Sequence, residues 1–282
     1  MKPVINLLFY SNFWIAACAT AMILQTQLLI TDEVTFTPLV GLVFCSTLFL
    51  YAIHRIVGLF KVEPFTKTGR YQVISTFKNH IIFYAVLAAI SGLFFFWQIP
   101  FPVKMALIIP GILSMAYVLP FLSGKRRLRD LNFIKIFLVA IVWAWVSVLL
   151  PYLEMGEPLD SSLVFMVLER AFFIFAITLP FDIRDLKVDA HNNVQTIPAR
   201  IGARQSKYLA AGLMAISMFF VLLNTYTHFY SLWTAFGLLI STFITVFVIN
   251  YSDRTEEDYF FTGLVDGMML VQFGVVYGVS FL

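Results

Sequence analysis

Nine apolar segments of about twenty residues recur along this chain, and they constrain its fold more than any other feature. Each segment is long enough to cross a bilayer as a helix. Only 12% of the 282 residues are charged, against roughly 25% in an average soluble domain. The pattern predicts an all-α polytopic membrane protein, a bundle of nine transmembrane helices forming a single domain over 1–282. The expected spans are 7–30, 38–60, 77–98, 101–121, 133–152, 161–181, 206–224, 229–250 and 261–281.

The connections between these spans alternate in charge. One set is basic, around 61–78, 125–129 and 184–207, whereas the other set is acidic, as at 154–160. The positive-inside rule places the basic set in the cytoplasm, with the N-terminus inside and the C-terminus outside. We expect an integral protein of the bacterial inner membrane without a nucleic-acid partner. The first apolar run is longer than the core of a signal peptide, so we expect it to remain as a helix.

The stretch "LPFDIRDLKVD" at 179–189 places Asp182, Asp185 and Asp189 at the end of an apolar span. If the helix continues through this stretch, the three carboxylates form one stripe, because residues at i, i+3 and i+7 lie within about 60° of one another. Carboxylates on one face suit Mg²⁺, which commonly bridges them to substrate phosphates. The plainer alternative is that they are loop carboxylates paired with neighbouring basic residues.

Three stretches resemble the UbiA superfamily of intramembrane prenyltransferases. The three aspartates match its second Asp-rich motif, D-x-x-D-x-x-x-D, and "TIPARIGARQSKYLA" at 196–210 is similar to its T-x-P-x-R-x-G stretch. "AYVLPFLSGKRRLRDLNFIKIFLVAIVWAW" at 116–145 is similar to its Tyr-x-x-Pro, basic-loop and Trp-containing passage. The resemblance implies nine helices with cytoplasmic catalytic loops. It also implies transfer of a polyprenyl group from its diphosphate to an aromatic or other lipophilic acceptor, with membrane lipid as a further partner.

The resemblance further implies the roles of individual residues. Asp182, Asp185 and Asp189 would be the catalytic residues and would hold Mg²⁺ on the diphosphate. Cationic side chains would bind the diphosphate itself, and the candidates are Arg55, Lys125, Arg184, Arg200 and, when protonated, His54.

The chain departs from the family at the first Asp-rich motif, N-D-x-x-D-x-x-x-D. The equivalent stretch reads "TLFLYAIHRIVGLFKVEPF", and no Asp, Glu or Asn occurs between residues 38 and 62. Arg55 stands there instead, a permanent cation whose planar fork suits phosphate. We therefore expect fewer Mg²⁺ ions than in relatives with two motifs. Alternatively, Arg55 is a positive-inside anchor that reaches the lipid headgroups.

Two functions remain open on these observations. The second Asp-rich motif and its tail favour a prenyltransferase. The absent first motif favours a non-catalytic protein of the same fold that binds a prenyl lipid or a membrane partner. A transporter is less well supported, because the usual pair of Gly- or Pro-broken half-helices is missing from the sequence.

Three charged residues are expected within the membrane. Glu169 and Arg170 lie near the middle of the sixth span, where charges are costly and usually functional or paired. Being adjacent on a helix, they point about 100° apart and are not expected to pair with each other. Asp266 could meet Arg170 or the basic lining of a cytoplasmic cavity. A structural ion pair and a role in the site are both open.

Overall fold

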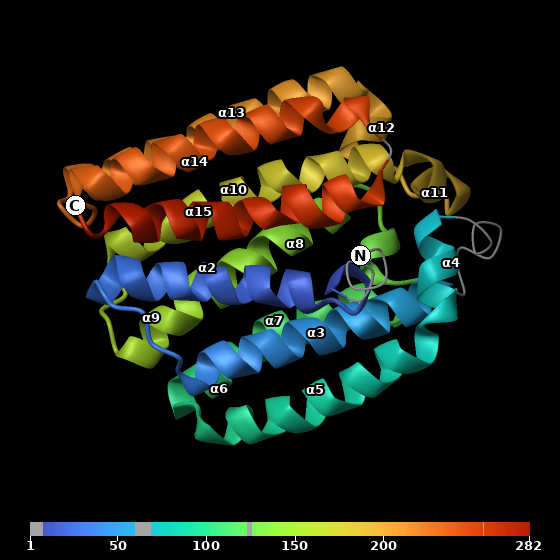
Figure 1. The fold of residues 1–282 in the computed structure, drawn as a ribbon, viewed down its shortest axis with the longest axis horizontal. Coiled ribbons are helices and arrows are strands. Elements are labelled where there is room, and N and C mark those ends of the chain that lie inside the picture. Colours follow the sequence, from blue (N-terminus) through green and yellow to red (C-terminus); the bar gives the residue numbers. More distant parts are fainter. Residues whose placement is uncertain (1–7, 60–68, 123–125, 256) are drawn as a thin grey trace.

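The computed structural model describes residues 8–59, 69–122, 126–255 and 257–282. In these ranges, nine helical spans are long and apolar enough to cross a membrane. They run side by side in one bundle (Figure 1), and the described residues form no β-strand. The structure therefore confirms an all-α integral membrane protein with nine spans.

Six of the spans are uninterrupted helices and three are broken. The uninterrupted ones are α2 (Phe13–Thr31), α3 (Pro38–Leu59), α5 (Lys78–Gln98), α10 (Ser161–Arg184), α13 (Ala203–Tyr226) and α14 (Leu232–Tyr251). The broken ones are α6 (Phe101–Ala106) with α7 (Ile108–Val118), then α8 (Ile134–Ala144) with the π-helical turn η4 (Trp145–Leu149) and α9 (Leu150–Met155), and last the π-helical η6 (Phe260–Val265) with α15 (Asp266–Val279).

Prolines account for two of the three breaks. Pro110 has no N–H to donate to the carbonyl of Ala106, and α6 ends at Ala106. Pro151 likewise cannot donate to the carbonyl of Ser147, which lies in the π-helical turn just before it. The missing proline N–H thus interrupts the regular α-helix in these two spans without ending them.

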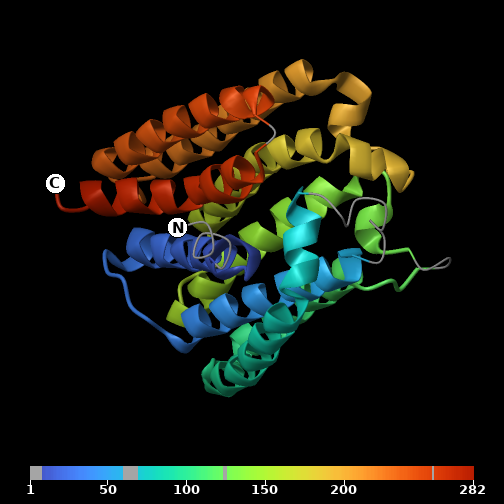
Figure 2. The same ribbon diagram turned by 45° about the vertical axis from the view of Figure 1, so that its right-hand side comes forward.

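Short helices gather at one end of the bundle. They are α4 (Gly69–Thr76), η3 (Leu128–Asp130), α11 (Leu186–His191), α12 (Ile197–Ile201) and η5 (Ser252–Arg254). Figures 1 and 2 show α4, α11 and α12 together at this end and the C-terminus at the other. We call it the α11 end. The Asp-rich stretch and the residues that follow it lie at the α11 end.

The interior and the outer surface of the bundle are both apolar. Phe173 and Ile177 of α10 are buried against Met214 of α13 and Met268 of α15. Large apolar side chains are also exposed on the outward faces, among them Phe94, Trp97, Phe243 and Phe247. So much exposed apolar surface would favour aggregation in water, whereas in a bilayer these side chains contact lipid chains.

The Asp-rich stretch does not form one continuous helix. Helix α10 runs past Pro180 and ends at Arg184, three residues beyond the expected span, and α11 begins at Leu186. Asp185 lies at the break, with φ −89° and ψ 3°. The condition for a single stripe of carboxylates, one helix running through all three aspartates, is therefore not met, because the chain turns at Asp185.

Candidate functional site

A cavity of about 250 Å³ lies at the α11 end of the bundle, and eleven charged side chains contribute to its wall. They come from elements far apart in the sequence. Its basic residues are Arg55, Arg127, Arg129, Lys135 and Arg184, and its acidic residues are Asp130, Asp182, Asp185, Asp189, Asp258 and Asp266. Charges of opposite sign therefore nearly balance within this charged cavity.

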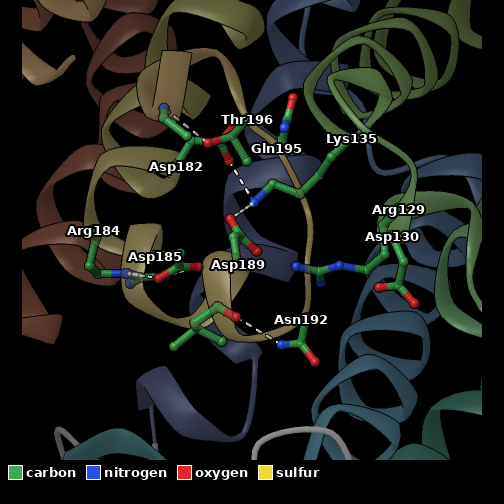
Figure 3. A network of polar contacts seen from close by, with 12 residues as sticks. Arg129, Asp130, Lys135, Asp182, Arg184, Asp185, Asp189, Asn192, Gln195 and Thr196 are labelled. Atoms are coloured by element: carbon green, nitrogen blue, oxygen red, sulfur yellow. Dashed lines mark hydrogen bonds and ion pairs between the residues drawn. The ribbon is translucent and has the colours of Figure 1, made fainter. Parts of the chain in front are cut away.

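Lys135 joins two of the three aspartates of the second motif. Its Nζ lies 2.7 Å from Oδ1 of Asp182 and 2.8 Å from Oδ2 of Asp189. Figure 3 shows the ammonium between the two carboxylates, reaching them from the first turn of α8. All three residues are buried, with 6%, 2% and 7% of their surfaces exposed. The turn between α10 and α11 thus brings both carboxylates to one cation.

Asp185 belongs to a second ion-pair cluster. Nε of Arg184 lies 2.9 Å from its Oδ1, and Nη1 of Arg184 lies 2.8 Å from Oδ1 of Asp258. Tyr10 donates its hydroxyl to Oδ2 of Asp258 at 3.0 Å. Burial and the Asp258 carboxylate raise the pKa of Tyr10 well above its ordinary value, so the phenol stays a neutral donor. This cluster joins the end of α10 to Tyr10, just before α2, and to Asp258, just before η6.

Arg55 lies in the wall of the charged cavity. Its Nη2 donates to the carbonyl of Phe9 at 3.0 Å, and its Nη1 donates to the carbonyl of Tyr10 at 3.2 Å. The guanidinium also lies 5.3 Å from the centre of the Tyr10 ring. These contacts direct Arg55 toward the inside of the bundle, which favours a role in the cavity over the headgroup anchor.

His54 and Arg129 contact each other where the first Asp-rich motif would lie. The Arg129 guanidinium stacks over the Tyr117 ring at 5.2 Å and points toward the aspartate cluster in Figure 3. Burial acts to lower the pKa of Arg129, but Tyr117 and Asp189 raise it, and the net pKa lies above the ordinary value. Arg129 therefore faces the cavity as a permanent cation, and sequence reasoning did not single it out.

The stretch after the aspartates is attached to the beginning of α8. Asn132 accepts a hydrogen bond from the backbone N–H of Gln195 at 2.9 Å, and Phe133 donates its N–H to the Gln195 carbonyl at 2.9 Å. Thr196 caps α12 by accepting from the N–H of Ala199. These bonds hold α11 and α12 beside the helix that supplies Lys135.

Two of the predicted diphosphate ligands are not brought into this cavity by the described structure. Arg200 is exposed, does not belong to the cavity wall, and stacks 5.9 Å from the centre of the Phe133 ring. Lys125 lies outside the described residues. Arg184, Arg55 and His54, by contrast, line the same cavity as the three aspartates.

An apolar cavity of about 170 Å³ adjoins the charged one. Both cavities are bordered by Tyr51, His54, Tyr117, Val139 and Trp143. Aliphatic side chains of α3, α7 and α8 complete the apolar lining. Because the two cavities share these lining residues, charged groups and an apolar pocket lie side by side, the arrangement expected for a ligand with an ionic head and an apolar tail.

The aspartates as they lie do not fit a divalent metal ion. Among the described residues, no group of three or more His, Cys, Asp or Glu side chains is arranged to hold one. Asp182 and Asp189 already bind the Lys135 ammonium, and Asp185 binds Arg184. A metal at either position would have to displace a cation of the chain.

The intramembrane charges contact different partners. Oε2 of Glu169 accepts from the Tyr230 hydroxyl at 2.9 Å, whereas Nη1 of Arg170 donates to the Met22 carbonyl at 2.9 Å and to Oγ of Ser147 at 3.3 Å. No ion pair within 4.0 Å joins Glu169 and Arg170 in the described structure, in agreement with their angular separation. Asp266 was expected to meet either Arg170 or the basic lining of a cavity, and it lies in the wall of the charged cavity.

Comparisons with known proteins agree with this architecture. The model of the UbiA prenyltransferase family matches residues 72–271. A UbiA homologue from Archaeoglobus fulgidus bound to GPP and Mg²⁺ superposes with a TM-score of 0.68 at 11% identity, over 99% of this chain and 100% of that one. A UbiA homologue from Aeropyrum pernix K1 gives 0.60 at 12% identity, over 98% and 97%. A digeranylgeranylglyceryl phosphate synthase structure gives 0.60 at 14% identity, over 99% and 98%. No curated protein sequence matches.

Proposed function

Because this chain belongs to the UbiA prenyltransferase family, we propose that it transfers a polyprenyl group from its diphosphate to an aromatic or other lipophilic acceptor within the membrane. One observation carries the proposal. The charged cavity and the apolar cavity share a border of aromatic side chains, Tyr51, Tyr117 and Trp143. A prenyl diphosphate has the matching shape, an anionic head joined to an apolar tail.

The chemistry assigns the two cavities different tasks. The bond between the prenyl carbon and the diphosphate oxygen breaks, the diphosphate keeps the electron pair, and the acceptor attacks the prenyl carbon and then releases a proton. Arg55, Arg129 and Lys135 would stabilise the charge on the departing diphosphate. The faces of Tyr51 and Trp143 would stabilise positive charge on the prenyl carbon.

Magnesium stays a prediction for this chain. A UbiA homologue has been solved with GPP and Mg²⁺, and Mg²⁺ would neutralise a diphosphate if it were bound here. Since Lys135 holds Asp182 and Asp189 in the structure, we assign no step of the reaction to a metal. A substrate that carries its own ion into the cavity would have to displace this ammonium.

The alternative function is binding of a prenyl lipid, or of another membrane partner, without turnover. It is favoured by the missing acids between residues 38 and 62 and by the ion pairs of all three motif aspartates. Both functions place an isoprenoid ligand in the same cavities, so binding alone does not separate them.

Turnover separates the two functions. Purified protein in nanodiscs would be incubated with prenyl diphosphates of several chain lengths and a lipid extract as the source of acceptors. We expect release of diphosphate together with a prenylated lipid detected by mass spectrometry. Binding of the prenyl diphosphate without either product, both with and without Mg²⁺, would establish the non-catalytic function instead.

We also propose that the α11 end faces the cytoplasm of a bacterial inner membrane, with the N-terminus inside and the C-terminus outside. In a variant without Cys18 and Cys45, a cysteine at Arg204 should be protected from an impermeant thiol reagent added outside intact cells. A cysteine at Glu157 should react, because acidic connections lie outside. Labelling of both positions from the same side would contradict the nine-span topology.

A further inference from the structure

Lys135 places a buried ammonium group in the wall of the charged cavity. It contacts two carboxylates from two different elements, Asp182 of α10 and Asp189 of α11, at 2.7 and 2.8 Å. Both contacts are ion pairs, and the one to Asp189 is also a charge-assisted hydrogen bond. Because the side chain of Lys135 is only 8% exposed, water contributes little to the neutralisation of the two carboxylates. A single cation therefore joins the two ends of the motif.

A divalent cation would satisfy the same two carboxylates. Two buried carboxylates close to one another repel unless a cation lies between them. The ammonium supplies one positive charge for two negative ones, whereas Mg²⁺ would supply two. Mg²⁺ keeps several waters and is commonly held by one or two carboxylates. It binds their oxygens at about 2.0–2.1 Å, and the cavity of about 250 Å³ that Lys135, Asp182 and Asp189 line leaves room for its waters.

In the part of the wall that α3 contributes, basic side chains likewise stand where acidic metal ligands are expected. Helix α3 contributes His54 and Arg55 to the described lining, and Arg129 contacts His54. No acid occurs between residues 38 and 62 to serve as a metal ligand from this helix. Cations of the chain thus stand on both sides of the charged cavity.

We propose that the Lys135 ammonium takes the place of a divalent cation between Asp182 and Asp189, and that removing its charge opens a divalent-cation site on these carboxylates. The wild-type chain accordingly binds no divalent ion at this position. The proposal goes beyond prenyl transfer and holds or fails without any prenyl substrate, so its outcome is independent of the turnover assay.

The test measures metal binding in detergent-solubilised, full-length protein. Lys135→Met removes the charge, Lys135→Gln removes it but keeps hydrogen-bond donors, and Lys135→Arg keeps it. Electron paramagnetic resonance of Mn²⁺ would count bound ions, and the melting temperature would be recorded with EDTA and with millimolar Mg²⁺. For Lys135→Met and Lys135→Gln we expect one Mn²⁺ per chain and a rise in Tm of at least about 4 °C with Mg²⁺. Wild type and Lys135→Arg should show neither.

A further variant locates the ion. Adding Asp182→Asn and Asp189→Asn to Lys135→Met should abolish both the Mn²⁺ signal and the rise in Tm. The proposal is overturned if wild type binds Mn²⁺ as tightly as Lys135→Met, because the ammonium then does not occupy the position. It is equally overturned if neither neutral variant binds Mn²⁺. Lys135→Gln keeps the test decisive if Lys135→Met does not fold, since its amide can still donate to the carboxylates.

Discussion

Replacing Arg170 by Met is expected to lower the free energy of unfolding by about 3–5 kcal/mol. Arg170 is completely buried in α10 and donates to the Met22 carbonyl of α2 and to Ser147 of the π-helical turn. The methionine cannot donate to either group, although the Met22 carbonyl still accepts from the Thr26 hydroxyl at 3.2 Å. It also leaves Glu169, 1% exposed, without the neighbouring positive charge. Both losses are costly where water cannot replace the missing groups.

Unfolding in mixed micelles, titrated with a denaturing detergent, would measure this change. Arg204→Met is the matched control, because Arg204 is a cation at the exposed beginning of α13 and its loss should cost no more than about 0.5 kcal/mol. If Arg170→Met were as stable as wild type, the contacts of Arg170 would not hold α10 against α2.

Replacing Arg55 by Ala is expected to weaken binding of a prenyl diphosphate by about 10- to 100-fold. A charge-assisted hydrogen bond to a buried anion contributes about 1.5–3 kcal/mol, and Arg55 is the cation that α3 contributes to the cavity beside His54. Arg55→Lys should recover only part of the affinity, because an ammonium lacks the planar fork. Titration calorimetry with a non-hydrolysable prenyl diphosphate analogue would compare the three proteins.

Arg55 also holds the Phe9 and Tyr10 carbonyls, so the melting temperature of each variant must be measured beside the affinity. A lower affinity in Arg55→Ala without a matching loss in Arg204→Ala would locate the effect in the cavity. Binding equal to wild type would remove Arg55 from the head-group site and favour the non-catalytic function.

The motif aspartates illustrate how far sequence reasoning reached. The spacing of Asp182, Asp185 and Asp189 predicted that they act together, and the structure places all three in one cavity. Their partners were not evident from spacing. Asp258 comes from the segment before η6, and Lys135 comes from α8. A lone lysine at the edge of an apolar span was a usable signal, since a buried cation in a membrane helix generally has an acidic partner.

For Arg200, by contrast, the sequence predicted a place in the cavity that the structure does not show. Its place in the T-x-P-x-R-x-G stretch suggested a diphosphate ligand, yet the side chain is exposed and lies over Phe133. The backbone around it explains why. Thr196 caps α12 and Gln195 bonds to Asn132, so this stretch joins two parts of the α11 end and directs Arg200 away from the charged cavity.

By itself, the sequence determined the membrane class, the number of spans and the chain position of the aspartate motif. Span length and apolarity are local properties, because in a bilayer each helix must satisfy its own backbone hydrogen bonds. Only the tertiary structure decided which cation meets which carboxylate. That choice depends on the break between α10 and α11 and on the placement of α8 beside it. Such pairings join residues that share no periodicity, and they form only when the helices pack.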